Sequence, residues 1–183
     1  MPVGPSTLRI VHYPDPVLRR RARPVTEPAP EVRAVALRML ELMKEAEGIG
    51  LAAPQVGVPW RLFVAHVPPG ENRSLESTPP TAMASPVVFI NPVLSEPGGL
   101  IEAYEEGCLS LPEITGDVMR PMEITVSATD LEGRAFSMRG AGLLARCWQH
   151  EVDHLDGVLI IDRMTQLSRL RARAAVRGLE KGM

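Results

Sequence analysis

The sequence predicts one α+β domain, with small antiparallel or mixed β-sheets around a single central helix. Runs typical of strands cluster before and around a helical segment near residue 150. They do not alternate regularly with helices, as the strands of a doubly wound sheet would. The chain has 183 residues, of which 45% are hydrophobic and 23% are charged. This composition suits one globular domain with its own core, so no second domain is required.

The first part of the chain predicts a short strand and an amphipathic helix. Residues 8–11, with the sequence LRIV, are typical of a strand. Pro30 suits a first helical position, and apolar residues then recur at helical spacing until Gly48 provides a stop. These apolar residues are Val32, Val35, Ala36, Met39, Leu40 and Met43. The small residues of 48–57 would let backbone approach a ligand closely, although a tight turn explains the glycines equally well.

The middle of the chain predicts strands and one long loop. Trp60–Val67 and Val87–Leu94 are rich in Val, Ile and Phe, as strands are. Between them, Pro68–Pro86 is dense in Pro, Ser and Thr, and we expect a mobile surface loop. Met122–Thr129 and Arg134–Met138 flank a turn and predict a hairpin.

The last part of the chain predicts two helices. Leu143–Leu155 is expected to be the central helix, and Val158–Ile161 a short strand or extended segment. Thr165 or Ser168 would cap a last helix that runs to about Lys181.

Charge and hydropathy limit the class of protein. No apolar run is long enough to span a bilayer and no charged-then-apolar leader begins the chain, so we expect a cytoplasmic protein without a membrane partner. The formal net charge of -2 argues against a general nucleic-acid-binding surface, and we expect no DNA partner. The charge is uneven, because residues 163–183 hold six basic residues and one acidic residue, a net +5 that leaves -7 for the rest. Two cysteines do not make a disulfide framework.

A metal-binding motif lies in the predicted central helix. His150 and His154 are about one turn apart, about 40° around the axis and about 6 Å along it, so both imidazoles can reach one ion. Glu151 lies about 100° round the helix from His150, which suits a carboxylate that contacts a metal-bound water without binding the metal. This His-Glu-x-x-His pattern is typical of hydrolytic metal sites and makes Glu151 the candidate general base. The alternative is a solvated helix that carries two unrelated histidines.

Cysteine is the better source of a third ligand. Ile160 occupies the position at which one large class of zinc proteases has its third histidine, and Glu180 is the only later glutamate. Cys147 lies seven residues before His154, about 10 Å along the helix, so the two side chains cannot bind one ion together. Cys108 is therefore the candidate ligand.

Three segments together resemble the peptide deformylase family. They are Gly48–Gln55 (GIGLAAPQ), Glu106–Ser110 (EGCLS) and Gln149–His154 (QHEVDH). Their order and approximate spacing match that family, and the similarity extends over nearly the whole chain. The resemblance implies a hydrolase that removes the N-formyl group from the N-terminal formylmethionine of newly made polypeptides and releases formate.

The resemblance also implies roles for individual residues. The metal ligands would be Cys108, His150 and His154. Glu151 would be the acid and base, while the Gln55 side chain and the Leu109 backbone N–H would stabilise the oxyanion.

A substrate pocket follows from the same resemblance. The substrate backbone would pair with the chain around Ile49 and Gly50, and an apolar pocket would take the methionine side chain. The lining would include Ile49, Tyr104, Glu106, Leu143 and Cys147. Plain core packing explains Leu143 and Cys147 equally well.

Two departures from the family pattern bear on peptide preference. The 68–86 loop is longer than in many members, and Thr115 stands where some members carry an arginine near the substrate backbone. Two other functions stay open, a metallopeptidase that cleaves ordinary amides and a non-catalytic homologue. Ile160 disfavours the peptidase, and the intact Glu151 and Gln55 disfavour the non-catalytic homologue.

Metal and partners are expected from the same comparison. A thiolate with two imidazoles accepts Fe2+, Co2+, Ni2+ and Zn2+ alike. The resemblance implies Fe2+ in the cell, with zinc or nickel in purified protein. The partners would be N-formylmethionyl nascent peptides. The basic C-terminal helix could also dock on ribosomal RNA; the alternative is a solvated helix face packed by Leu167, Leu170 and Ala174.

Overall fold

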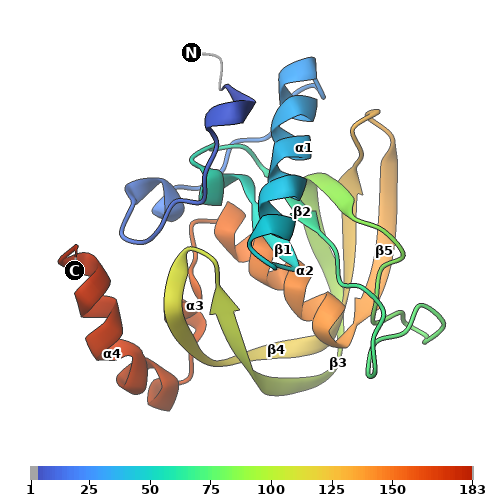
Figure 1. Ribbon diagram of the computed structural model, residues 1–183. Helices are drawn as coiled ribbons and strands as arrows, with labels where there is room; N and C mark the ends of the chain where they lie inside the picture. Colours follow the sequence, from blue (N-terminus) through green and yellow to red (C-terminus); the bar gives the residue numbers. More distant parts are fainter. Residues whose placement is uncertain (1–3, 183) are drawn as a thin grey trace.

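Five strands form one antiparallel sheet, and four α-helices pack around it in the computed structural model, which describes residues 4–182 (Figure 1). In sheet order, the strands are β1 (Gly50–Ala52), β2 (Leu62–Ala65), β3 (Val87–Cys108), β4 (Leu111–Thr129) and β5 (Ala135–Ala141). The helices are α1 (Pro30–Glu45), α2 (Gly142–Leu155), α3 (Ile160–Arg163) and α4 (Gln166–Glu180). Short 3-10 turns are η1 (Pro5–Thr7), η2 (Pro16–Arg19) and η3 (Ala53–Val56). The α+β domain with N-terminal, central and C-terminal helices is confirmed, and its strands form one sheet.

Helix α1 forms because its sequence has helix signals at both ends and an apolar stripe between them. Pro30 begins the helix, Glu31 lies in the first turn and Lys44 in the last, where each charge complements the helix dipole. The buried residues are Val32, Val35, Ala36, Met39, Leu42 and Met43. This stripe packs on β1 and β2, so the predicted amphipathic helix is confirmed.

Helix α2 lies between β1 and the long strands β3 and β4 (Figure 1). Trp148 is fully buried on this helix, with its ring centroid 5.9 Å from that of Phe89. Gly140 of β5 packs directly on the indole, because a Cβ atom at Gly140 would lie 2.7 Å from Trp148. This close contact fixes α2 against the sheet, and with it the two histidines that α2 carries.

Strands β3 and β4 form a long hairpin that curls beneath α2 (Figure 1). Their register shifts between Ile90 and Ile101 bend the pair. Most side chains of 95–105 are exposed, so no alternating pattern marks this stretch. The strands predicted at Val87–Leu94 and Met122–Thr129 therefore cover only parts of β3 and β4. The first part of β4 was also missed, although Leu111, Ile114 and Val118 are buried there.

Two predicted strands are wrong. Leu8–Val11 pairs with no strand, although the Val11 N–H donates to the Gln55 carbonyl at 2.8 Å. Val158–Ile161, expected to be a short strand or an extended segment, forms no strand: Leu159 is extended, and α3 begins at Ile160. Apolar side chains of both segments pack into the core without a partner strand, which apolar composition alone cannot distinguish from sheet.

The segment 68–86 contains no helix or strand, but main-chain hydrogen bonds tie it to the body. The Met83 N–H donates to the Val67 carbonyl at 2.7 Å, and the Ala141 N–H donates to the Pro80 carbonyl at 2.9 Å. These bonds hold the segment near the start of α2. Within residues 4–182, no helix is both long and apolar enough to cross a membrane.

Thr165 caps helix α4, since its hydroxyl accepts a hydrogen bond from the Ser168 N–H at 3.3 Å. Ser168 is buried against the body, and the same helical face continues with Ala172, Val176 and Leu179. Leu167 and Leu170 are 56% and 65% exposed. The expectation that they pack this helix is wrong, because the stripe that begins at Ser168 faces the body instead.

Candidate metal centre

Three predicted ligands meet at one point. Cys108 ends β3, while His150 and His154 lie on successive turns of α2. The Cys108 Sγ is 3.3 Å from the His154 Nε2, and the two histidine Nε2 atoms are 3.1 Å apart. Ligands about 2.0–2.3 Å from one tetrahedral ion would lie about 3.3–3.6 Å apart. The observed spacing lies at or just below that range, so the donor set fits one divalent ion.

Glu106 orients the first histidine. Its Oε2 lies 3.1 Å from the His150 Nδ1, so a proton on Nδ1 leaves the Nε2 lone pair free to face the site. Arg120 donates to both oxygens of Glu106, and Arg146 donates to Oε1. Burial alone would raise the pKa of Glu106, but the bonds from His150 and Arg120 hold this pKa well below its ordinary value. Glu106 is therefore a buried carboxylate that fixes the ring.

The groups around His150 favour a positive charge at the candidate metal centre. Burial would lower the pKa of His150, but Cys108, Glu106 and then Glu151 raise it well above its ordinary value. A divalent cation benefits from the same negative groups. Burial lowers the pKa of His154 well below its ordinary value, which keeps that ring neutral, as a ligand must be.

Glu151 points into the space beside the ligands. The residue is buried, and its Oε2 has no hydrogen-bond partner among the described residues. Burial raises the pKa of Glu151 to about 7. A carboxyl group with such a pKa can accept and return a proton near neutrality. Gly50 leaves room for it, since a Cβ atom at Gly50 would lie 2.3 Å from the Glu151 Oε1.

Gln55 is held in one orientation beside the metal ligands. Its Oε1 accepts a hydrogen bond from the Ala52 N–H at 2.8 Å. Its Nε2 lies 3.2 Å from the Ser110 Oγ, which holds the amide in place, and 3.6 Å from the Sγ of the candidate ligand Cys108. Leu109, which directly follows Cys108, lines the same space.

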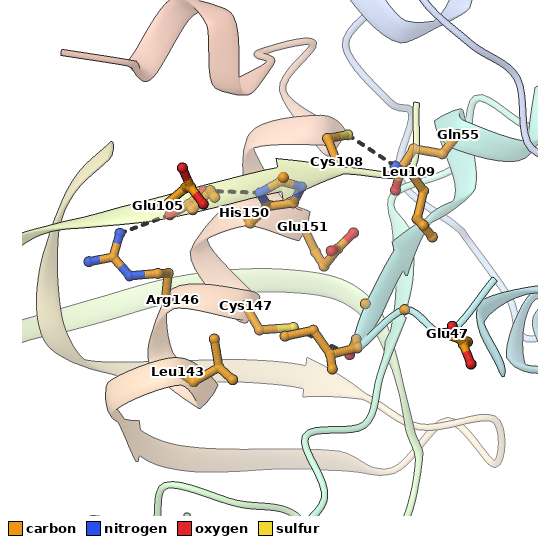
Figure 2. Close-up of a pocket in the computed structure, with 15 residues that line it drawn as sticks. Glu47, Gln55, Glu105, Cys108, Leu109, Leu143, Arg146, Cys147, His150 and Glu151 are labelled. Atoms are coloured by element: carbon orange, nitrogen blue, oxygen red, sulfur yellow. Dashed lines mark hydrogen bonds and ion pairs between the residues drawn. The ribbon is translucent and has the colours of Figure 1, made fainter. Parts of the chain in front are cut away.

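A cavity of about 390 Å³ opens beside this centre (Figure 2). The expected substrate-binding residues that lie on it are Ile49, Gly50, Glu106, Leu143 and Cys147. The Cys147 Sγ lies 3.4 Å from the Ile49 carbonyl oxygen. Burial raises the pKa of the Cys147 thiol well above its ordinary value, so it stays protonated and packs as an apolar group.

Tyr104 lies on a second cavity instead of the first. Its side chain is 60% exposed, and the Arg146 guanidinium lies over its ring, 5.5 Å from the centroid. Arg146 is also part of the wall of the first cavity, where it separates Tyr104 from that space.

Several buried polar residues were absent from the sequence-based set. They are Ser110, Arg120, Arg146 and Asp153. Asp153 accepts from Arg120 at 2.8 Å and from Arg163 at 2.7 Å, which extends the ion-pair network from Glu106 to the end of α3. Helical spacing offered a signal for Arg146, since it lies one turn before His150. Asp153 also lies at helical spacing from His150, and Ser110 ends the EGCLS segment, whereas Arg120 has no such signal.

Comparison with known proteins finds similarity over nearly the whole chain. The family model described as polypeptide deformylase matches residues 7–170. The peptide deformylase of Opitutus terrae is 45% identical over 181 residues, covering 96% of this chain and 94% of that protein. The peptide deformylase of Acidobacterium capsulatum is 45% identical over 172 residues, covering 94% of this chain and 95% of that protein.

Solved structures are similar over almost the whole chain. The Plasmodium falciparum peptide deformylase in complex with an inhibitor has a TM-score of 0.80 and 37% identity, covering 94% of this chain and 99% of that one. The peptide deformylase of Thermotoga maritima has a TM-score of 0.76 and 41% identity, covering 86% of this chain and 97% of that one.

Proposed function

Because this chain belongs to the peptide deformylase family, it is a metal-dependent hydrolase that removes the N-formyl group from nascent peptides, and we propose that Cys108, His150 and His154 hold its metal ion. The family and the reaction expected from the three motifs are confirmed. The convergence of one sulfur and two nitrogens within 4.8 Å of one another supports the ligand assignment most directly. A divalent ion bound there would polarise the formyl oxygen and lower the pKa of a bound water.

Glu151 is the acid and base of the reaction in this proposal. Its unpartnered Oε2 and a pKa of about 7 suit a group that takes a proton from the attacking water. The same carboxyl group then delivers that proton to the departing nitrogen, because an amine anion is a poor leaving group.

Gln55 and Leu109 stabilise the negative charge that develops on the formyl oxygen. The Gln55 amide is oriented in advance by Ala52 and Ser110, so no reorientation is needed when the charge forms. The backbone N–H of Leu109 follows the Cys108 ligand directly and would supply the second donor.

The substrate binds as an added strand in this proposal. β1 is an edge strand of the sheet, and Ile49 and Gly50 line the cavity. A peptide backbone could therefore pair along Ile49 and Gly50 while its methionine side chain enters the space between Leu143 and Cys147.

Fe2+ is the proposed metal in the cell, and Zn2+, Ni2+ or Co2+ could replace it in purified protein. The test is formate release from formyl-Met-Ala-Ser under anaerobic conditions, with metal content measured on the same sample. The acetyl counterpart is the matched control. Cleavage of both peptides would contradict specificity for the formyl group. Cleavage of neither by metal-replete protein would contradict the deformylase activity.

The C-terminal helix is proposed to contact ribosomal RNA in the cytoplasm, where nascent peptides emerge. Arg169, Arg173 and Arg177 lie together along the groove between α4 and the body, and each could neutralise one phosphate. Deleting the chain beyond Arg169 should abolish co-sedimentation with ribosomes at low salt, whereas unchanged co-sedimentation would contradict the contact.

A further inference from the structure

A second cavity lies next to the substrate cavity. It has a volume of about 440 Å³, compared with about 390 Å³ for the first. Its walls are the side chains of Tyr104 and Met122 and residues 71–73 of the 68–86 segment. Two residues line both cavities, Leu143 and Arg146, which lie three positions apart on α2 and so face the same way.

Arg146 is a fixed part of the wall between the cavities. On one side its Nη1 donates to the Glu106 Oε1 at 2.9 Å, and on the other its guanidinium lies over the Tyr104 ring. Bonds to the carbonyl oxygens of Val118 and Glu102, at 2.8 and 2.9 Å, hold it in place. A buried cation with these partners does not leave its position without losing several charge-assisted bonds.

Leu143 is the removable part of the same wall. Its side chain is half-buried and, as a hydrocarbon, is held only by packing against its apolar neighbours. Shortening Leu143 would therefore open a passage beside Arg146 without disturbing the Glu106 carboxylate that orients His150.

We infer that Leu143 and Arg146 form a partition that limits the length of the substrate's first side chain, and that the second cavity can accept linear alkyl chains longer than that of methionine. This inference rests on the proposed binding of the methionine side chain beside Leu143. Tyr104 and Met122 supply apolar surface for such a chain, and Glu71 and Arg73 also line this cavity.

The test compares two peptides, N-formyl-norleucyl-Ala-Ser and N-formyl-2-aminononanoyl-Ala-Ser. The second has three more methylene groups, and burial of each is worth roughly fourfold in binding. The measured quantity is the ratio of kcat/KM for the long peptide to kcat/KM for the norleucyl peptide. Leu143→Ala should raise this ratio by at least tenfold and by up to roughly 60-fold.

A variant that fills the second cavity shows whether the gain comes from that cavity or only from enlargement of the first cavity. Adding Met122→Trp to Leu143→Ala should remove most of the gain, because the indole would occupy the space into which the chain extends. Leu100→Ala, at a residue that is 73% exposed, is the matched control and should leave the ratio unchanged. Leu143→Val removes fewer atoms than Leu143→Ala, so it offers a smaller opening and should give a smaller gain.

An unchanged ratio in folded Leu143→Ala and Leu143→Val would overturn the partition. A gain that survives Met122→Trp would overturn the role of the second cavity. Formate release from the norleucyl peptide by the unaltered protein tests the proposed function separately, since that peptide needs no passage through the wall.

Discussion

Replacing Glu106 with glutamine should weaken metal binding without removing a metal ligand. The carboxylate accepts four hydrogen bonds, two from Arg120, one from Arg146 and one from His150. An amide offers one oxygen, and its nitrogen must then face two donors. If the oxygen keeps the Oε1 position, the nitrogen faces the His150 Nδ1. His150 would then carry its proton on Nε2, the atom that faces the metal.

The size of the effect follows from these contacts. Loss of a residue that orients a metal-bound histidine typically lowers metal affinity about 10- to 100-fold, or about 1.4–2.7 kcal/mol. Breaking a buried ion pair costs about 3–5 kcal/mol. The lower end of this range applies here, because Arg120 keeps its bond to Asp153 and Arg146 keeps its bonds to two backbone carbonyls. About 3 kcal/mol corresponds to a fall in Tm of about 6–12 °C for a domain of this size.

Two measurements on Glu106→Gln check this reasoning. Metal titration of the purified protein gives the affinity, and thermal unfolding of the metal-free protein gives the Tm. Glu105→Gln is the matched control, because its side chain is exposed on the neighbouring position of β3. A metal affinity equal to that of the unaltered protein would refute the orienting role of Glu106, even if the Tm fell.

Further substitutions test the centre itself. Glu151→Gln should keep a full equivalent of metal while kcat falls by about 10²- to 10⁴-fold, and unaltered turnover would remove Glu151 from the mechanism. Cys108→Ala should lose most of its metal and Cys147→Ala should keep it; metal analysis with the opposite result would refute the ligand assignment. Gly50→Ala places a Cβ atom 2.3 Å from the Glu151 Oε1, so turnover should fall by about tenfold or more with metal retained. Gly178→Ala, with no atom within 4 Å of the new Cβ, is its control and should be unaffected.

The sequence was most informative where function depends on helical spacing. The positions of His150, Glu151 and His154 follow from the geometry of one regular helix, so their relation could be predicted before any tertiary contact was known. The same holds for α1, whose buried stripe repeats at helical intervals. Its apolar pattern and the signals at its ends act within a few residues.

The polar network around Glu106 could not be predicted in that way. Arg120 and Arg146 lie 14 and 40 residues away along the chain and meet Glu106 only because β3, β4 and α2 pack together. A single sequence carries no signal for such pairings. Tyr104 illustrates the same limit. It does not line the substrate cavity because the Arg146 side chain lies between them, and the sequence does not show where that side chain lies. Residues 95–105 of β3 were not predicted as strand, because a strand with most side chains exposed lacks an alternating burial pattern.

The position of β1 at the end of the sheet has a consequence for how many substrates one enzyme can serve. β1 pairs with β2 on one side, and within residues 4–182 no strand pairs with its other side. Main-chain amide and carbonyl groups are the same in every residue except proline, which lacks the N–H. In the proposed binding mode, a peptide bound through its main chain would be accepted almost regardless of its composition, and only its first side chain would enter a pocket. One enzyme that binds its substrates in the proposed way would serve nascent chains of many different sequences.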